Sequence, residues 1–192
     1  MRIHGDKTLQ RRMDVPHQDD YRKYKPDLQD DFQHICGYCG KHECLSHRGM
    51  EIDHFVPKKV DQDRQRDYQN LVYSCFCCNR KKGKKWPTKD KHLQHNGTQG
   101  FVDPATPEYD EHLGRNENGS IVFNTAVGRY MYETFRFDLR ATDIIWKATI
   151  YHELVEQLMR NINAAPPQEQ ERYIKASVEL FKMRQYLFDC GE

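Results

Sequence analysis

Short apolar runs alternate with cysteine, histidine and basic residues between residues 31 and 95. β-Forming residues at 52–56 end at Pro57, and a second β-forming run covers 71–73. Each run predicts a strand. The polar and basic residues that begin at Asn79 predict the start of a short helix. This part of the chain is therefore expected to form a strand, a long loop, a second strand and a helix, a ββα unit.

Beyond about residue 125 the apolar positions take a helical spacing. Apolar residues recur three and four positions apart between Ile144 and Ile162, and a second such run extends from Ile174 to Phe188. This spacing is typical of an amphipathic helix. The Ala-Ala-Pro-Pro segment at 164–167 separates the two runs, so the pattern predicts an antiparallel helical hairpin.

Two segments lack such periodicity. Residues 1–30 are polar with mixed charge, and we expect them to form a loosely packed N-terminal arm. Residues 96–120 are rich in Gly, Pro, Asn and Asp, which favours connecting loops with little regular structure. Within them, Asn118-Gly119 precedes a β-forming run and indicates a turn into a short strand. The expected organisation is an arm (1–30), a core (31–95) and loops followed by a hairpin (96–192).

Composition limits both the core and the partners. Hydrophobic residues make up 37% of the 192 residues and charged residues 31%, so the core is expected to be thin and a metal ion would help to hold it together. The formal net charge is +1, and any nucleic-acid site must therefore come from local clustering of charge. The sequence has no membrane-spanning run and no secretory signal. We therefore expect a cytoplasmic protein without membrane contact.

The seven cysteines include two C-x-x-C pairs, Cys36 with Cys39 and Cys75 with Cys78. In a reducing compartment, metal ligation is favoured over disulfide formation. Two such pairs can close a tetrahedral site of four thiolates, the usual geometry of structural zinc. The sequence therefore predicts a zinc ion held by these four cysteines.

Other interpretations of the cysteines remain open. A local site could use Cys36, Cys39, Cys44 and His47, although the second pair would then have no role. A redox pair is a further alternative, but the βαβ context of such pairs is missing. Cys77 is expected to be a core residue or a free thiol.

The segments between and after the cysteine pairs contain the parts of a phosphodiesterase site. Hydrolysis needs a base for the attacking water and a cation beside the phosphate. His54 is the candidate base near neutral pH, and Asp53 and Asn79 offer the oxygen ligands that suit Mg²⁺ or Mn²⁺. Asn70 could bond the loop backbone and hold the His54 strand in position. Glu51 could support the site or be an exposed strand acid, and we favour the exposed acid slightly.

The order of EIDHFVP, Asn70 before LVYSC, and CNRKKG resembles the HNH, or ββα-metal, endonucleases over about residues 34 to 86. The resemblance implies that Asp53 and Asn79 hold one catalytic Mg²⁺ or Mn²⁺ ion, that His54 is the general base and that Asn70 is the middle asparagine. Many members have histidine where this chain has Asn79, whereas the HNH domain of RNA-guided CRISPR nucleases also has asparagine. The implied function is a metal-dependent endonuclease, with DNA as the expected substrate.

The expected fold class is α+β, with a small ββα-metal core, zinc knuckles and a mainly α-helical C-terminal part. Basic residues lie on both sides of the expected metal site. A charge run is usually a solvated face, but its place beside the metal favours contacts to phosphate, which position a nucleic acid without reading its sequence. The residues expected to make these contacts are Lys58, Lys59, Arg80, Lys81, Lys82, Lys84 and Lys85.

A second resemblance concerns the segments FVDPATPEYDEHL and NGSIVFNTAVGRYM. They are similar to HNH proteins of bacterial anti-phage defence systems such as the Septu nuclease subunit, which works beside an ATPase. This resemblance implies a role in defence and an ATPase partner. Trp146, Phe181 and Phe188 of the hairpin could then form the partner contact, or they could pack on the core.

Two other functions stay open at this stage. One is a zinc-ribbon module that binds nucleic acid or protein without cutting it. The other is a restriction or homing HNH nuclease that acts alone.

Overall fold

The two expected strands pair with each other in a computed structural model that describes residues 1–160, 162, 165–189 and 191. β1 (Met50–His54) runs antiparallel to β2 (Leu71–Cys75). β2 continues directly into α2 (Phe76–Lys82), so the helix begins at Phe76 and not at Asn79. The ββα unit predicted from the sequence is present. Cys190 lies outside the described residues.

The other elements surround this unit, and the mixture of helices and small sheets confirms the α+β class. In chain order they are η1 (Tyr21–Tyr24), α1 (Lys25–Asp31), η2 (Glu43–Leu45), η3 (Asp63–Arg66), η4 (Tyr68–Asn70), α3 (Tyr109–His112), β3 (Leu113–Arg115), β4 (Ile121–Phe123), α4 (Ala126–Phe135), η5 (Phe137–Leu139), α5 (Thr142–Met159) and α6 (Pro167–Asp189).

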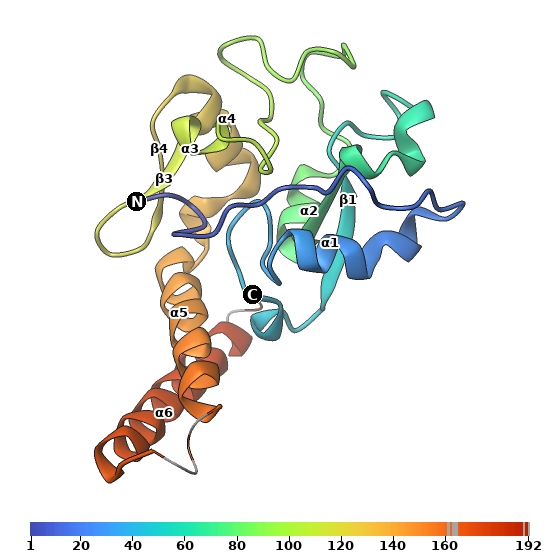
Figure 1. The fold of residues 1–192 in the computed structure, drawn as a ribbon. Coiled ribbons are helices and arrows are strands. Elements are labelled where there is room, and N and C mark those ends of the chain that lie inside the picture. Colours follow the sequence, from blue (N-terminus) through green and yellow to red (C-terminus); the bar gives the residue numbers. More distant parts are fainter. Residues whose placement is uncertain (161, 163–164, 190, 192) are drawn as a thin grey trace.

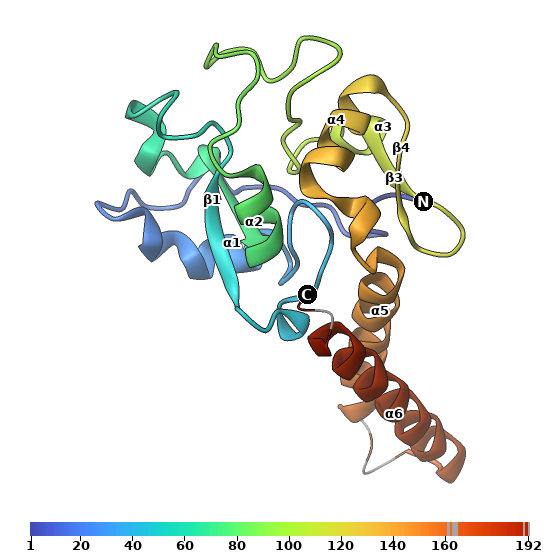
Figure 2. The ribbon, with the colours of Figure 1, turned by 180° about the vertical axis from the view of Figure 1, so that it is seen from behind.

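Three groups of elements are visible in Figure 1. α1, β1 and α2 lie together in blue to green, and α3, β3, β4 and α4 lie beside them in yellow. α5 and α6, in orange and red, project away from both groups, as Figure 2 shows from behind. One large apolar cluster joins the first two groups and includes Phe32, Val72 and Phe135. A smaller cluster lies under the hairpin and consists of Leu45, Ile145, Ala148, Leu180 and Leu187.

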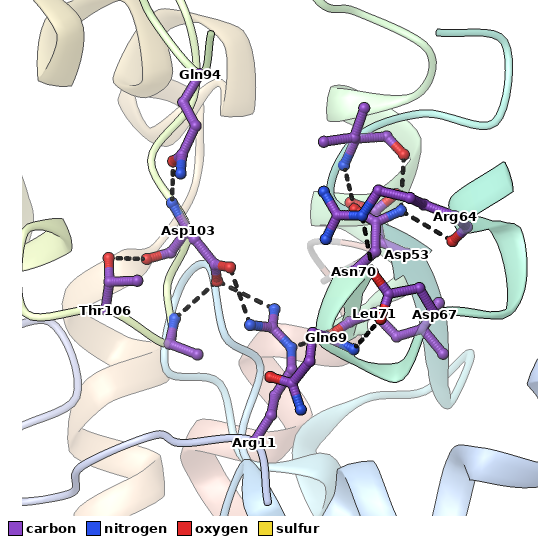
Figure 3. A network of polar contacts seen from close by, with 12 residues as sticks. Arg11, Asp53, Arg64, Asp67, Gln69, Asn70, Leu71, Gln94, Asp103 and Thr106 are labelled. Carbon is purple, nitrogen blue, oxygen red and sulfur yellow. Dashed lines mark hydrogen bonds and ion pairs between the residues drawn. The ribbon is translucent and has the colours of Figure 1, made fainter. Parts of the chain in front are cut away.

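Residues 1–30 are anchored to the core at several buried positions while many of their side chains stay exposed, so the expected loose arm is held in place at these points. Ile3 is 0% exposed and Arg11 is 6% exposed. The Arg11 guanidinium donates two hydrogen bonds to the carboxylate of Asp103, at 2.9 and 3.0 Å, and a third to the carbonyl of Leu71 (Figure 3). Polar composition does not reveal these anchors, because the buried polar groups are satisfied by partners far away in the sequence.

Residues 96–120 contain more regular structure than the sequence indicated. β3 pairs antiparallel with β4, and the turn between them passes through Gly119 at a φ of +92°. This pairing confirms the turn predicted at Asn118-Gly119. Glycine adopts such a positive φ without strain.

The helical hairpin is also confirmed, as α5 and α6. The Trp146 ring packs against the body of the protein, 4.5 Å from the Arg115 guanidinium and against Gly119. Phe181 and Phe188 remain 69% and 56% exposed. Of the three aromatic residues that could form a partner contact, Trp146 therefore packs against the protein itself, whereas Phe181 and Phe188 are exposed. No described helix has the length and apolar content needed to cross a bilayer.

Candidate functional site

The cysteines of the two C-x-x-C pairs form one buried cluster. Cys36 and Cys39 follow α1, Cys75 ends β2 and Cys78 lies in the first turn of α2. Their four Sγ atoms all lie within 4.8 Å of one another, and the Sγ atoms of Cys39 and Cys75 are 3.8 Å apart. Two thiolates bound at about 2.3 Å to a tetrahedral zinc ion are about 3.8 Å apart. The buried four-sulfur donor set therefore fits structural zinc.

The local alternative with Cys44 and His47 finds no support, since the second pair completes the cluster. Cys44 lies instead with His42 and His152. Cys77 points away from the cluster and packs half-buried against the core.

Side chains from distant segments hold the first C-x-x-C loop in place. Three consecutive carbonyl groups of this loop each accept one hydrogen bond. The donor and acceptor pairs are His4 Nε2 to Gly37 O, Tyr109 Oη to Tyr38 O and Arg115 Nη2 to Cys39 O, each at 2.7 Å. Burial lowers the pKa of His4 to about 4, so its imidazole is neutral at pH 7 and donates through Nε2.

Arg140 lies against the sulfur atoms themselves. Its Nη1 is 3.2 Å from Cys78 Sγ, and its Nη2 is 3.8 Å from Cys39 Sγ and 4.0 Å from Cys75 Sγ. Hydrogen bonds from the neighbouring thiols lower the pKa of Cys39, and the charge of Arg140 lowers it further. Four thiolates around a divalent ion leave an excess of negative charge, which this guanidinium offsets. The sequence analysis missed Arg140 because no local pattern connects it to the cysteines.

A second group of predicted residues lines an open hollow of about 510 Å³. The end of β1 contributes Asp53 and His54, and α2 contributes Asn79. Lys59 and Lys84 line the same hollow. The structure therefore brings the candidate base, the candidate oxygen ligands and part of the basic run to one place.

The imidazole of His54 is held in one orientation. Its Nε2 lies 2.8 Å from the Gln65 carbonyl, and because a carbonyl only accepts, Nε2 carries the proton and Nδ1 keeps its lone pair. The Tyr21 ring packs edge-on against the imidazole at 4.7 Å. Burial, and then the charge of Lys58, lower the pKa of His54 below 6.5. The His54 imidazole is therefore neutral at pH 7 and held in one orientation.

Asn70 holds the loop that carries Gln65. The side chain is fully buried, and its Oδ1 accepts from the Val56 N–H at 2.8 Å. Its Nδ2 donates to the carbonyls of Val56 and Arg64 at 3.1 and 3.2 Å (Figure 3). Because Gln65 follows Arg64 directly, Asn70 fixes the backbone whose carbonyl orients His54.

Asp53 forms a buried ion pair. Its Oδ2 lies 2.8 Å from Lys82 Nζ and accepts from the Tyr38 hydroxyl at 2.6 Å. Lys82 also donates to the His54 carbonyl at 2.9 Å and is 0% exposed. Both bonds to Asp53 use the same oxygen, so Oδ1 is the oxygen that can serve a ligand.

The burial of Lys82 corrects its assignment as a phosphate contact. A side chain without solvent exposure cannot reach a nucleic acid, and its ammonium already binds Asp53. The sequence did contain a signal, because Lys82 lies four residues after Cys78 and so shares its face of the helix. Since Cys78 is buried, that face points into the core.

Glu51 has more contacts than an exposed strand acid would. Its Oε2 accepts from Asn79 Nδ2 at 2.6 Å, and its Oε1 pairs with Arg80 at 3.0 Å. Alternation along β1 places Glu51 and Asp53 on one face of the strand. Glu51 therefore lies beside the candidate site, and part of the charge of Arg80 is used there.

The rest of the basic run remains exposed. Trp86 is 6% exposed and packs edge-on against Phe55, so it is a packing anchor. The exposed lysines Lys58, Lys59 and Lys84 line the hollow, whereas Lys81 and Lys85 line a separate hollow beside Tyr130 and Glu133.

Comparison with known families agrees with this geometry. Residues 36–85 match the HNH endonuclease family. The matched segment contains both cysteine pairs, β1, β2 and α2. No curated protein and no solved structure matches the chain, so the resemblance to the Septu nuclease subunit gains no support.

The cluster predicts a coupling between zinc and folding. Cys78→Ser should lose the zinc ion of the four-cysteine cluster and unfold, because zinc binding contributes folding free energy. Cys77→Ser is the matched control and should keep both zinc and fold. Zinc content by mass spectrometry and far-UV circular dichroism measure the two effects. A folded Cys78→Ser protein with unchanged zinc content would contradict the assignment of the ligands.

The burial of Lys82 predicts a stability effect. Lys82→Ala should lower the free energy of unfolding by about 3–5 kcal/mol, because it leaves the Asp53 carboxylate buried without its partner. Lys81→Ala, an exposed neighbour, should change it by less than about 0.5 kcal/mol. Urea unfolding of both variants tests this difference, and equal stabilities would show that Lys82 is not a core ion-pair residue.

Proposed function

We propose that this chain is a metal-dependent endonuclease that hydrolyses phosphodiester bonds of nucleic acid, with His54 as the general base. The observation that carries the proposal is the neutral His54, oriented by the Gln65 carbonyl, in one hollow with Asp53 and Asn79. The family match over residues 36–85 supports the same activity.

The proposed reaction uses the free nitrogen of His54. Nδ1 takes the proton from a water molecule as its oxygen attacks phosphorus, while the bond from phosphorus to the leaving oxygen breaks. Gln65 keeps the imidazole in the tautomer that can accept this proton. The exposed ammonium groups of Lys59 and Lys84 at the hollow bind the phosphates on either side of the scissile bond.

The oxygen donors at the hollow suit a divalent cation. Asp53 through Oδ1 and Asn79 through its amide oxygen would hold Mg²⁺ or Mn²⁺, with the carboxylate of Glu51 beside them. A cation there stabilises the charge on the phosphate and the leaving oxygen. Lys82 holds the other oxygen of Asp53 and so fixes the direction of the carboxylate.

DNA is the proposed substrate, on the resemblance to HNH nucleases. Lys59 and Lys84, which line the hollow, contact the phosphates. Such contacts position a duplex without reading its bases. Only the resemblance to anti-phage HNH proteins suggests a role in defence and an ATPase partner. The structure adds no argument for either, and we do not propose them.

A zinc-ribbon module that binds without cutting is the second candidate. It would use the cysteines and the lysines but not an oriented neutral imidazole beside carboxylate and amide oxygens. A plasmid cleavage assay in Mg²⁺ or Mn²⁺ separates the two functions, because the module binds the plasmid and leaves it intact.

His54→Ala tests the base. We expect the cleavage rate to fall by about 10²–10⁴-fold, as is typical when a general base is removed, while DNA binding and fold persist. His92→Ala removes an exposed imidazole elsewhere and should leave the rate unchanged. A His54→Ala protein that cleaves at the wild-type rate would exclude His54 as the base.

The pH dependence of the wild type follows from the same group. The pKa of His54 is lowered below 6.5, so the base is deprotonated at neutral pH. The cleavage rate should rise with pH through this lowered pKa and then level off, with the protonated base inactive on the acid side. A rate limb whose midpoint lies above pH 7 would contradict the assignment.

Asn79→Ala tests the catalytic cation separately from structural zinc. We expect loss of Mg²⁺-dependent cleavage with unchanged zinc content, because the amide oxygen is an oxygen ligand and the cluster uses sulfur. Asn96→Ala, in an exposed loop, is the amide control. If Asn79→Ala lost the zinc ion while still folded, the division between the two metal sites would be wrong.

A further inference from the structure

A second cluster of metal-ligating side chains lies where the hairpin meets the core. His42 and Cys44 flank the start of η2, and His152 lies in the middle of α5. One ligand atom from each residue lies within 4.8 Å of the other two. The same distance limit encloses the four cysteines of the first cluster. His42 and Cys44 lie within the matched segment 36–85 and His152 lies outside it, and the proposed activity uses none of the three.

The side-chain types at this cluster suit a metal ion, and burial raises the pKa of the Cys44 thiol to about 12, so the thiol is protonated when no ion is bound. Burial, and then the neighbouring His152, lower the pKa of His42 to about 4, so the imidazole is neutral at pH 7. The imidazole rings of His42 and His152 are 4.3 Å apart between centroids. Cys44 is a free, half-buried thiol that forms no disulfide with a described cysteine. Two imidazoles and a thiol therefore face one another at this cluster.

Glu156 contacts one of the three candidate ligands, His152. It lies one helical turn beyond His152, and its Oε1 is 3.3 Å from His152 Nε2. A carboxylate that accepts from one nitrogen of a metal-binding histidine fixes its tautomer and leaves the other nitrogen for the ion. The carboxylate also adds negative charge beside the cluster.

The donor set identifies the class of ion. Thiolate and imidazole ligands favour zinc, whereas Mg²⁺ and Mn²⁺ prefer oxygen. Ligands of a tetrahedral zinc ion with bonds of about 2.0–2.3 Å are about 3.3–3.6 Å apart, so small side-chain movements bring the three ligand atoms to this spacing. When zinc binds, the bond from zinc to Cys44 Sγ forms, the S–H bond breaks and the proton passes to solvent.

A third cluster, His95, Glu108 and His112, provides a comparison. There Glu108 Oε1 already pairs with both imidazoles, at 3.0 and 3.5 Å. That cluster has no thiol, and its charges are satisfied by its own members. It therefore serves as a control and not as a metal site.

We propose that His42, Cys44 and His152 form a second zinc site, which fastens the α5–α6 hairpin to the nuclease core. The hairpin rests on a small apolar cluster around Leu45, and the His42 backbone N–H donates to Thr149 Oγ1 on α5 at 3.3 Å. Figures 1 and 2 both show the end of α6 returning to the region of η2. A metal ion at this junction stabilises an interface whose apolar contact is small.

Zinc content and hairpin protection test the proposal on the full chain. The wild type, after equilibration with zinc and gel filtration, should hold one zinc ion more than Cys44→Ser and one more than His152→Ala. Cys77→Ser and His95→Ala should match the wild type. Removal of Glu156 by Glu156→Gln should weaken binding of this second ion by about 10–100-fold. Hydrogen exchange in α5 should be faster in Cys44→Ser than in Cys77→Ser.

The zinc content of the wild type and of the Cys44→Ser protein decides whether the second zinc site exists. A wild-type protein that holds only the ion of the four-cysteine cluster in excess zinc overturns the proposal, and so does a Cys44→Ser protein with wild-type zinc content. Should Cys44→Ser fail to fold, His152→Ala gives the same comparison, because His152 lies on one helix with a partly exposed side chain. Loss of one ion in both variants, with the controls unchanged, supports the site.

Discussion

The first C-x-x-C loop is the point on which the rest of the structure depends. One large apolar cluster packs the first two groups of elements together, and polar contacts to this loop fix how the separate segments meet around it. Its sulfur atoms join the start of α2, and Arg140, which precedes the hairpin, lies against them. Its carbonyls bind the N-terminal segment, α3 and β3 through His4, Tyr109 and Arg115. Loss of the cluster would therefore weaken the contacts of the N-terminal segment, α2, α3, β3 and Arg140 at once.

The same cluster determines where the candidate active site lies. Cys78 fixes the rotation of α2 about its own axis. In this orientation Asn79 lies at the hollow and Lys82 lies in the core. Lys82 in turn binds Asp53, so one short helix sets the positions of both oxygen ligands. His54 is oriented independently, through the loop that Asn70 holds. The base and the cation ligands are thus positioned by two different sets of contacts.

The sequence was sufficient for the parts of the site that depend on local order along the chain. The strands, the cysteine pairs and the contacts of Asn70 all follow from short-range pattern. It was insufficient where a charged residue is buried by a distant partner. The sequence predicts a phosphate contact for Lys82 and a loosely packed arm around Arg11, whereas each side chain binds a carboxylate that only the folded chain brings near. Helical periodicity counted from Cys78 would have predicted that Lys82 is buried. No local pattern would have predicted the burial of Arg11.

The type of ligand atom at each site would direct different metal ions to different sites of this chain. Thiolates at the cluster and a thiolate with imidazoles at the hairpin both favour zinc, while Asp53 and Asn79 at the hollow offer oxygen ligands. Zinc binds most mixed sites more tightly than magnesium or manganese, so a histidine at position 79 would draw zinc into the hollow. Asparagine there replaces an imidazole nitrogen with an amide oxygen. Asn79 would thus lower the affinity of the hollow for zinc, and the proposed nuclease could hold zinc for its structure and a harder ion for its chemistry within one small domain.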